Sequence, residues 1–496
     1  MDVLKRRVFY IFLIVHAFLW TLVSLIRDVM SIDSMEAVTW GQLLSFGTNK
    51  HPPLSGWLMG GFYNLLGQHD IAAYILGQLC IVTGFIFIYK FAKSFISEEK
   101  AFCSVMILEA CLYYTFDVFI DNFNCNILFM ALWPMVIYYF YKSVSENKII
   151  NWILFGVTSG FAFLGKYQIV FLFMGMFLYL LFVQREQFRR KGMYLAIMVG
   201  SIIIAPHVIW LIQHDFFSFA YMIDRTQAAT NNLPIYLVKI SHIFYPIKFF
   251  LGLLSSVGAC VGIYLVTAWH AKNISIKPES DVKADRLFLL FIFFTPIIAQ
   301  GLMGFFTGNR VPAIWGSIMV CLTGVMLFYF LPIKFKENSF KFFTILSYAA
   351  MGISFLVVLI FWLFQTKFFI SYPYKTIVPD INNEWKEKTN NAPLKYVGGD
   401  IGYIFQFAYY NEQKPKVILD TFGHTNPWIN HEDVLNSGAI IILENEKSAK
   451  KKVHGFIELL PDNYEIKPEF YSAEICNKFG KCKNKDFYYI IVPPLK

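Results

Sequence analysis

Two acidic residues, Asp33 and Glu36, open the polar segment that follows the first apolar run. They are three residues apart and would share one face of a helix. Two such carboxylates could activate an acceptor as a general base or hold a cation. The same residues also suit a helix start, because Ser31 or Asp33 followed by Glu36 resembles a capping box. Spacing alone favours the cap, so a catalytic role needs support from other residues.

Lys50 and His51 stand directly before a double proline, Pro52-Pro53. Proline restrains itself and the preceding residue to extended backbone, so this block cannot be helical. The two side chains could therefore face a phosphate leaving group. The alternative is that Lys50 snorkels to a membrane interface and that the prolines only end a helix.

Lys166 lies in a very short link between two apolar runs, where a lysine is costly unless it is paired or snorkels to the headgroups. Other polar and aromatic residues also fall near the same ends of later runs. They are Asp121, Asn124, Asn126, Tyr167, His207, Arg310 and Trp315. If these ends face one side of a membrane, acids and cations converge there. Such a site would bind an anionic lipid headgroup and transfer a group.

The amino-acid composition indicates a membrane protein. Of 496 residues, 56% are hydrophobic and only 16% charged, which excludes a soluble, disordered or fibrous chain. A span needs about 20 apolar residues. About eleven transmembrane helices are predicted, at 8–27, 71–92, 101–116, 123–141, 150–165, 168–183, 193–213, 241–268, 287–306, 313–331 and 342–365.

The positive-inside rule orients these spans. Alternate loops carry nineteen Lys and Arg, and the opposite loops six. The N-terminus is therefore predicted in the cytoplasm, and the acids and cations above on the outer face. Most of the net charge of +9 belongs to the membrane part, so it is a topology signal and not a nucleic-acid footprint.

Beyond residue 365 the chain becomes polar, and a soluble extracytoplasmic α/β domain is predicted over 366–496. Short β-rich runs at 417–419, 439–443 and 487–492 alternate with polar stretches, one of them a candidate helix around 444–460. Cys476 and Cys482 would form a disulfide if this domain is extracytoplasmic, or remain free thiols. The other six cysteines are scattered through apolar runs and make no metal framework.

Taken together, these features resemble bacterial members of glycosyltransferase family 39, in the GT-C class, which includes lipid A-modifying transferases and protein O-mannosyltransferases. The resemblance rests on the long outer loop (about 28–70) with its acids, the His51-Pro52-Pro53-Leu54 block and the Gly165-Lys166-Tyr167 link, and it covers 1–365 well. It implies inverting sugar transfer from a polyprenyl (undecaprenyl) phosphate donor at the outer leaflet of a bacterial inner membrane. It implies no required cofactor, and a divalent metal stays open.

The resemblance also suggests roles. Asp33 or Glu36 would be the base; the family's acids are adjacent, whereas here they are separated. Lys50, His51, Lys166 and Arg310 would neutralise the leaving phosphate. A family acid at the start of the fourth span is matched by Asp121 or replaced by Asn124 and Asn126. The aromatic residues Trp40, Tyr167 and Trp315 could stack on sugar, and His207 completes the set of pocket candidates.

Lipid A is the favoured acceptor, with protein or another envelope glycan as alternatives, and the sugar stays open. A lipid-linked sugar flippase or other transporter would also need many spans, but would favour broken helices and midplane charges. A phosphoethanolamine transferase would need a zinc cluster in the soluble domain. His424, His431 and His454 lack ligand spacing.

Overall fold

The computed structural model describes residues 3–27, 29–216, 218–219, 223, 234–275, 277–368, 371–419, 429–445 and 468–495. The chain forms two compact units. The first comprises Met1–Ser24, Phe46–Ser55 and Tyr74–Val358, and the second Leu25–Ser45, Gly56–Ala73 and Leu359–Lys496. The second unit thus begins near the predicted boundary at 365 and also takes in most of the predicted outer loop.

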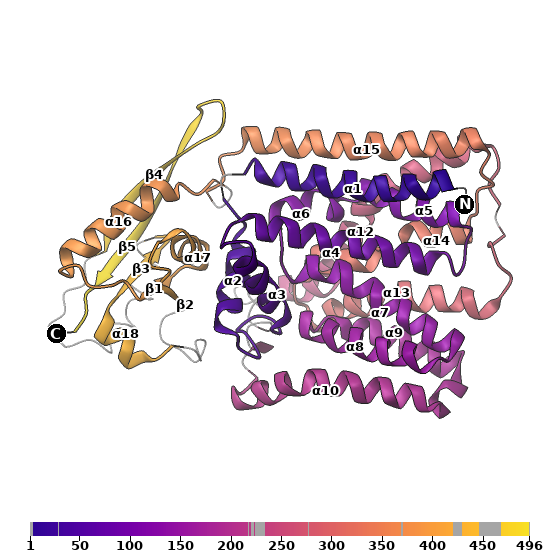
Figure 1. Ribbon diagram of the computed structural model, residues 1–496, viewed down its shortest axis with the longest axis horizontal. Helices are drawn as coiled ribbons and strands as arrows, with labels where there is room; N and C mark the ends of the chain where they lie inside the picture. Colours follow the sequence, from indigo (N-terminus) through magenta and orange to yellow (C-terminus); the bar gives the residue numbers. More distant parts are fainter. Residues whose placement is uncertain are drawn as a thin grey trace. The chain divides into compact units, whose positions relative to one another are not determined.

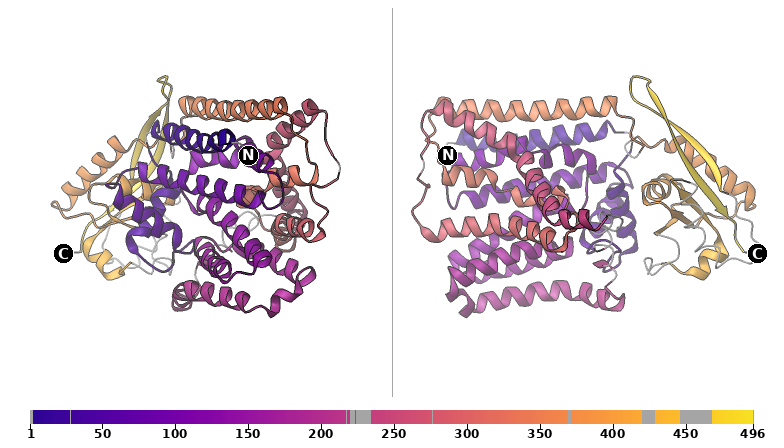
Figure 2. Two further views of the ribbon diagram at one scale, coloured as in Figure 1. Left: turned by 45° about the vertical axis from the view of Figure 1, so that its right-hand side comes forward. Right: turned by 180° about the vertical axis from the view of Figure 1, so that it is seen from behind.

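The first unit is a bundle of apolar helices (Figures 1 and 2). Within the described residues, seven helices are long and apolar enough to cross a membrane. They are α1 (Val3–Leu25), α4 (Ile71–Ala92), α7 (Cys125–Glu146), α10 (Lys191–Gln213), α12 (Ile235–Ala271), α13 (Lys283–Thr307) and α15 (Glu337–Phe364). The last turns of α15 belong to the second unit.

The four other predicted spans are also helical but are not long single helices. Two are the shorter helices α8 (Ile149–Gly165) and α9 (Ile169–Phe182). One is bent by 47° between η4 (Ala313–Val320) and α14 (Thr323–Phe330). The last is bent by 82° and consists of α5 (Glu98–Met106), η1 (Ile107–Ala110), η2 (Leu112–Tyr114) and α6 (Phe116–Asp121). The predicted membrane architecture is confirmed, with these two breaks added.

The sharper break lies where the backbone leaves the helix at Cys111, which is extended (φ −88°, ψ 122°). Just before it, the carboxylate of Glu109 contacts the imidazole of His16 from α1, and both side chains are fully buried. Ser354 of α15 donates to the backbone carbonyl of Glu109 at 3.5 Å. Partners from two other helices therefore contact the break.

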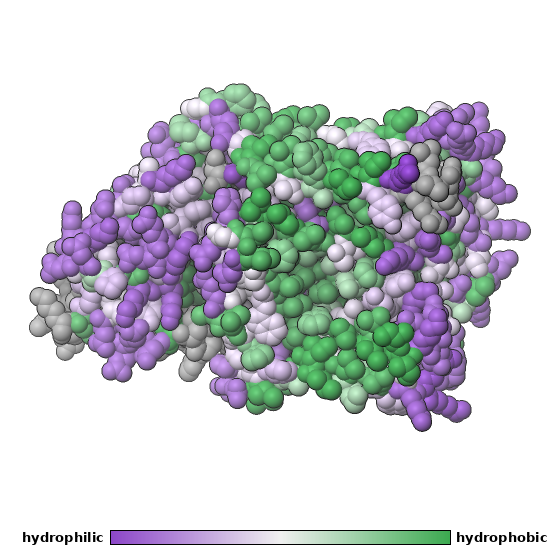
Figure 3. Space-filling model, viewed as in Figure 1, coloured by the Kyte–Doolittle hydropathy of each residue, from purple (hydrophilic) through white to green (hydrophobic). Residues whose placement is uncertain are grey.

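Long helices of the first unit present an apolar surface, and hydrophilic residues gather at the end of the bundle that carries the N-terminus (Figure 3). That end holds the loops whose lysines and arginines gave the predicted orientation. One of these loops contains the short 3-10 helix η3 (Arg185–Arg189). A multi-pass membrane protein is the architecture that such a surface requires, because exposed apolar area on this scale is stable only in lipid.

The second unit contains a five-stranded mixed sheet in the order β2-β1-β3-β5-β4. Its strands are β1 (Tyr396–Gly399), β2 (Lys416–Leu419), β3 (Ala439–Leu443), β4 (Glu469–Cys476) and β5 (Cys482–Val492). β1 pairs in parallel with β2 and β3, and β5 pairs antiparallel with β3 and β4. This confirms the predicted α/β pattern; the candidate helix around 444–460 lies mostly outside the described residues.

Helices α16 (Tyr374–Lys388), α17 (Ile401–Tyr410) and α18 (His431–Ser437) complete the C-terminal part of the second unit, with α17 against the sheet (Figure 1). The predicted outer loop supplies α2 (Ile32–Leu43) and α3 (Leu54–Leu65). α2 and α3 touch closely, because a Cβ added to Gly41 would collide with the backbone of Gly56 and Gly60. Only glycine permits this approach.

Two tyrosines at the end of α17 hold the loop helices. The hydroxyls of Tyr409 and Tyr410 donate to the two carboxylate oxygens of Asp70, at 2.7 and 3.0 Å. The backbone N–H of Met30, just before α2, donates to the Tyr410 hydroxyl at 3.0 Å. Burial and the charge of Asp70 raise the pKa of Tyr409 far above its usual value, so its hydroxyl remains a donor. This clip explains why the loop belongs to the second unit.

Candidate active site

The two carboxylates lie on α2, in the second unit. Asp33 is in the first turn and is partly exposed, whereas Glu36 is 2% exposed. The N-cap is Ser31, whose hydroxyl accepts the N–H of Ser34 at 3.2 Å. Neither carboxylate is the cap, so the capping interpretation applies to Ser31. Trp40, on the same helix, is 5% exposed and packs against Gly56, which makes it a packing residue.

The loop of residues 46–53 belongs to the first unit, and Thr48 shapes it. The Thr48 hydroxyl accepts the N–H groups of Lys50 and His51, at 3.2 and 2.9 Å, and donates to the carbonyl of His51 at 2.8 Å. Pro52 and Pro53 are buried after this turn. The extended conformation expected of the Lys-His-Pro-Pro block is therefore a tight turn, stabilised by a hydroxyl that sequence reasoning did not select.

His207 fastens this loop to the helix bundle. Its Nδ1 donates to the carbonyl of Phe46 at 2.6 Å, because a carbonyl can only accept. In the neutral ring Nε2 then accepts from the hydroxyl of Tyr167 at 2.9 Å. The rings of Tyr167 and His207 stack at 5.7 Å. These two predicted pocket residues thus connect the loop to the Lys166 link, and each already has a protein partner.

Lys166 is the C-cap of α8, and its ammonium donates to Oδ1 of Asn126 at 2.5 Å. It also lies 5.9 Å from the ring centre of Trp315. Asn124 caps α7 by accepting the N–H groups of Asn126 and Ile127, at 2.9 and 3.1 Å. Four predicted site residues, Lys166, Asn124, Asn126 and Trp315, therefore gather at the N-terminus of α7, where the helix dipole favours anions.

Asp121 ends α6 and accepts from the side chain of Asn124 at 2.8 Å. It therefore supports the cap of α7 in the same unit. Gln168 donates to the side chain of Gln300 and to the backbone carbonyl of Trp315. These contacts hold the start of α9 to the end of α13 and to η4. Gln300, 1% exposed, is a positioning residue that no local sequence signal distinguished.

His51, Lys50 and Lys166 form one electrostatic group, called the cation cluster below. Desolvation lowers the pKa of His51 well below its usual value, and the positive charges of Lys50 and Lys166 lower it further. The imidazole is consequently neutral near pH 7. A neutral imidazole does not supply the positive charge expected of His51, so within this group the two lysines carry the charge.

Arg310 has different surroundings from these three residues. It follows α13, its side chain is exposed, and it has no hydrogen bond or ion pair within the part of the chain that the structure describes. The electrostatic interaction on His51 links Lys50, His51 and Lys166 of the predicted phosphate-binding set, and the role predicted for Arg310 stays a prediction. The carboxylates of α2 belong to the other unit, and the chain connects the two sets through residues 44–46.

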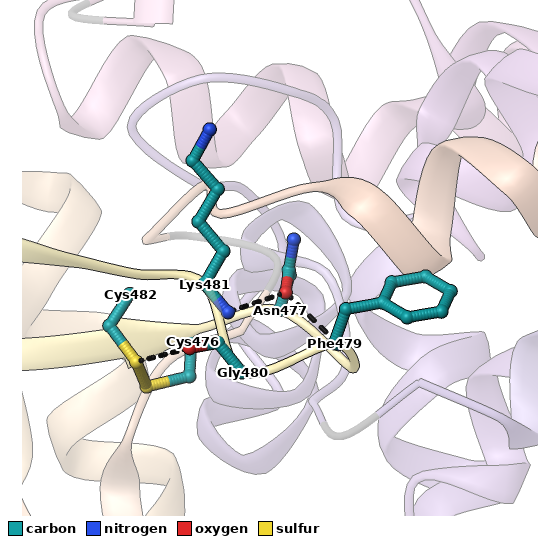
Figure 4. The surroundings of a disulfide bond; sticks show 6 residues. All are labelled: Cys476, Asn477, Phe479, Gly480, Lys481 and Cys482. Atoms are coloured by element: carbon teal, nitrogen blue, oxygen red, sulfur yellow. Dashed lines mark hydrogen bonds between the residues drawn. A yellow bond between two sulfur atoms is a disulfide. The ribbon is translucent and has the colours of Figure 1, made fainter.

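Cys476 and Cys482 are joined by a disulfide at the end of the β4–β5 hairpin (Figure 4). In the described part of the chain, these two cysteines and Glu474 form the group whose potential ligand atoms lie close enough together to hold a metal ion. The disulfide removes both thiolates, so this group does not suit one. His424 and His454 lie outside the described residues.

Comparison with known proteins agrees with this architecture. Residues 50–210 match the family described as dolichyl-phosphate-mannose-protein mannosyltransferase. This range contains the cation cluster and excludes α2. A segment of 201 residues, which is 40% of this chain, is 24% identical in sequence to the lipid A galacturonosyltransferase RgtD of Rhizobium johnstonii. The chain spans about two fifths (42%) of the length of that curated relative.

The whole fold resembles the crystal structure of ArnT from Cupriavidus metallidurans bound to undecaprenyl phosphate. The TM-score is 0.63 at 11% identity, and the alignment covers 99% of this chain and 98% of that one. At this identity the likeness concerns the fold. Together with the two sequence matches, it agrees with the predicted resemblance: the chain has the fold of that structure and, over part of its length, is similar to a lipid A galacturonosyltransferase.

Proposed function

We propose that the protein is an inverting membrane glycosyltransferase that moves a sugar from a polyprenyl-phosphate donor to an acceptor lipid, with lipid A as the favoured acceptor. The observation that carries this proposal is the cation cluster, whose Lys166 contacts the first turn of α7. The match of this segment to a family named for a dolichyl-phosphate-linked sugar supports it. The proposal places the site at the outer leaflet of a bacterial inner membrane.

In the proposed reaction an acceptor oxygen attacks the anomeric carbon of the donor. A bond forms between that oxygen and the carbon, and the bond from the carbon to the phosphate oxygen breaks on the opposite face. The acceptor proton passes to a carboxylate of α2, either Asp33 or Glu36. Inversion follows because there is a single displacement. The acids and the cation cluster thus take the base and leaving-group roles.

The charge change explains why two lysines are useful. A polyprenyl-phosphate sugar is a phosphodiester with one negative charge, and the leaving polyprenyl phosphate is a monoester that approaches two. Lys50 and Lys166 supply two positive charges, and His51 stays neutral. Because the phosphate gains charge only as the bond breaks, the lysines stabilise the transition state more than the donor.

The test uses proteoliposomes with a labelled polyprenyl-phosphate sugar and lipid A. We expect labelled lipid A, identified by mass spectrometry, and loss of product when Lys166 is replaced by Gln. Movement of the label between leaflets without a covalent product would instead favour a flippase. A labelled protein or glycan without labelled lipid A would redirect the proposal to those acceptors.

A further inference from the structure

The tip of the β4–β5 hairpin is built to be rigid. Strands β4 and β5 pair up to Cys476 and Cys482, which the disulfide joins. Across the five-residue turn, the side-chain oxygen of Asn477 accepts the N–H groups of Phe479 and Lys481, both at 3.0 Å (Figure 4). Gly480 has a φ of +78°, which glycine adopts without strain. The turn therefore fixes the direction of its exposed side chains.

This tip rests on the last turn of a membrane span. The ring of Phe479 stacks on Phe364 of α15, with ring centres 4.7 Å apart. The ammonium of Lys478 lies 4.5 Å from the ring centre of Trp362. The N–H of Lys478 donates to the carbonyl of Leu363 at 3.3 Å. Since α15 is apolar enough to cross a membrane and ends at Phe364, these contacts lie where a span leaves lipid.

Two properties of the tip remain unexplained by packing. Although their rings stack, Phe479 is 65% exposed and Phe364 is 60% exposed. At the same end of the hairpin, Lys481 and Lys483 are exposed and form no ion pair within the described residues. An apolar ring pair flanked by lysines, at the end of a span, matches the headgroup region of an anionic membrane. Residues 477–481 contain Lys478 and Lys481 and no acidic residue, so the tip is net positive.

We propose that the disulfide-closed tip, residues 477–481, inserts Phe479 into the interface of the leaflet that α15 reaches, with Lys481 and Lys483 on anionic lipid phosphates. The second unit then meets lipid at the hairpin as well as at α15. This surface is separate from the cation cluster. The inference requires α15 to be a span but does not depend on the proposed sugar transfer.

The experiment places the photo-crosslinking residue p-benzoylphenylalanine at position 479 of the full-length protein. The matched control carries it at Phe470, which is on the same hairpin and 58% exposed. Phe470 is six residues before Cys476, about 20 Å along an extended strand. Proteoliposomes of phosphatidylglycerol with phosphatidylethanolamine are irradiated, and lipid adducts are measured by mass spectrometry. We expect several-fold more lipid adduct at 479 than at 470.

The role of the lysine charges is tested by adding Lys481→Gln and Lys483→Gln to the protein that carries the photo-crosslinking residue at position 479. The preference of the adduct for phosphatidylglycerol over phosphatidylethanolamine should fall by roughly fivefold per lysine removed. The electrophoretic mobility of each variant, measured without reductant, verifies that the disulfide has formed. Equal lipid adducts at 479 and 470, or adducts at 479 to protein alone, would overturn the proposal. So would a lipid preference that both lysine substitutions leave unchanged.

Discussion

Replacing Lys166 by Gln removes one positive charge from the cation cluster and keeps a side chain of similar length that can still reach Asn126. In the folded protein the ammonium is held by Asn126 at 2.5 Å and sits 5.9 Å from the ring centre of Trp315. It also lies close enough to His51 to lower the pKa of that imidazole. The charge is therefore positioned before any donor binds, as electrostatic catalysis requires.

The size of the effect follows from Coulomb's law. One charge added to a phosphate about 4 Å from an ammonium is worth about 4 kcal/mol at an effective dielectric constant near 20. Glutamine retains part of this as a dipole, and removing one positioned donor from an anionic transition state typically costs about 3–4 kcal/mol. Because 1.36 kcal/mol is a factor of ten in rate, we expect sugar transfer to slow by roughly 10²–10³-fold.

The assay compares initial rates of transfer from a polyprenyl-phosphate sugar in proteoliposomes. The matched control is Lys142→Gln, which removes an ammonium from the other end of α7, where it pairs with Glu146. This control should keep its full rate. Lys166→Arg should recover part of the loss because the charge is retained. If Lys166→Gln transfers sugar within about threefold of the unmodified protein, the assignment of Lys166 to the leaving phosphate is refuted.

Three further predictions follow from other contacts. His51 stays neutral in the folded protein at pH values where the unfolded chain protonates it, so the free energy of unfolding should fall as the pH drops below about 6.5. His51→Gln should flatten the dependence of the apparent melting temperature on pH between 7 and 5; an unchanged slope would contradict this.

His16→Leu leaves the buried carboxylate of Glu109 without its imidazole and should destabilise the bundle by about 3–5 kcal/mol, whereas adding Glu109→Leu should recover part of the loss in thermal unfolding. Asp70→Asn weakens the two tyrosine hydrogen bonds that hold the loop helices. Because hydrogen bonds to a charged group are each worth about 1.5–3 kcal/mol, it should lower thermal stability and slow transfer, while an unchanged melting temperature would exclude the clip.

The parts of the fold that depend on local composition were predictable. Each apolar run is helical, because hydropathy over about 20 residues reports the solvent around a helix. Strands β2, β3 and β5 of the soluble part were recognised from short runs of β-branched and aromatic residues, whereas β1 and β4 were not. The break at Cys111 was missed because neither proline nor glycine marks it. Contacts between distant helices, including the one from His16 to Glu109, decide the structure there.

In the candidate site, too, residues with a local sequence signal were found and residues defined by distant contacts were missed. Lysine in a two-helix link is conspicuous in sequence, so Lys166 was found, and its partner Asn126 was among the polar residues noted at a span end. Thr48 and Gln300 were missed, because a hydroxyl that shapes a turn and a buried amide have no signature until the chain has folded. Arg310 was selected by type and position, and its side chain is exposed, so its role stays a prediction.

The neutral state of His51 bears on how the proposed enzyme releases its product. A third full charge beside Lys50 and Lys166 would bind the leaving phosphate more tightly, and tight binding of the product slows turnover once the bond has broken. Burial does most to prevent this by lowering the pKa of the His51 imidazole, and the charges of Lys50 and Lys166 lower it further. Lys166 is the smallest of these three influences, so its removal should raise the pKa of His51 while burial and Lys50 still hold it below its usual value. The acid limb of the rate profile should then move to higher pH in Lys166→Gln, and this shift should vanish when His51→Gln is added.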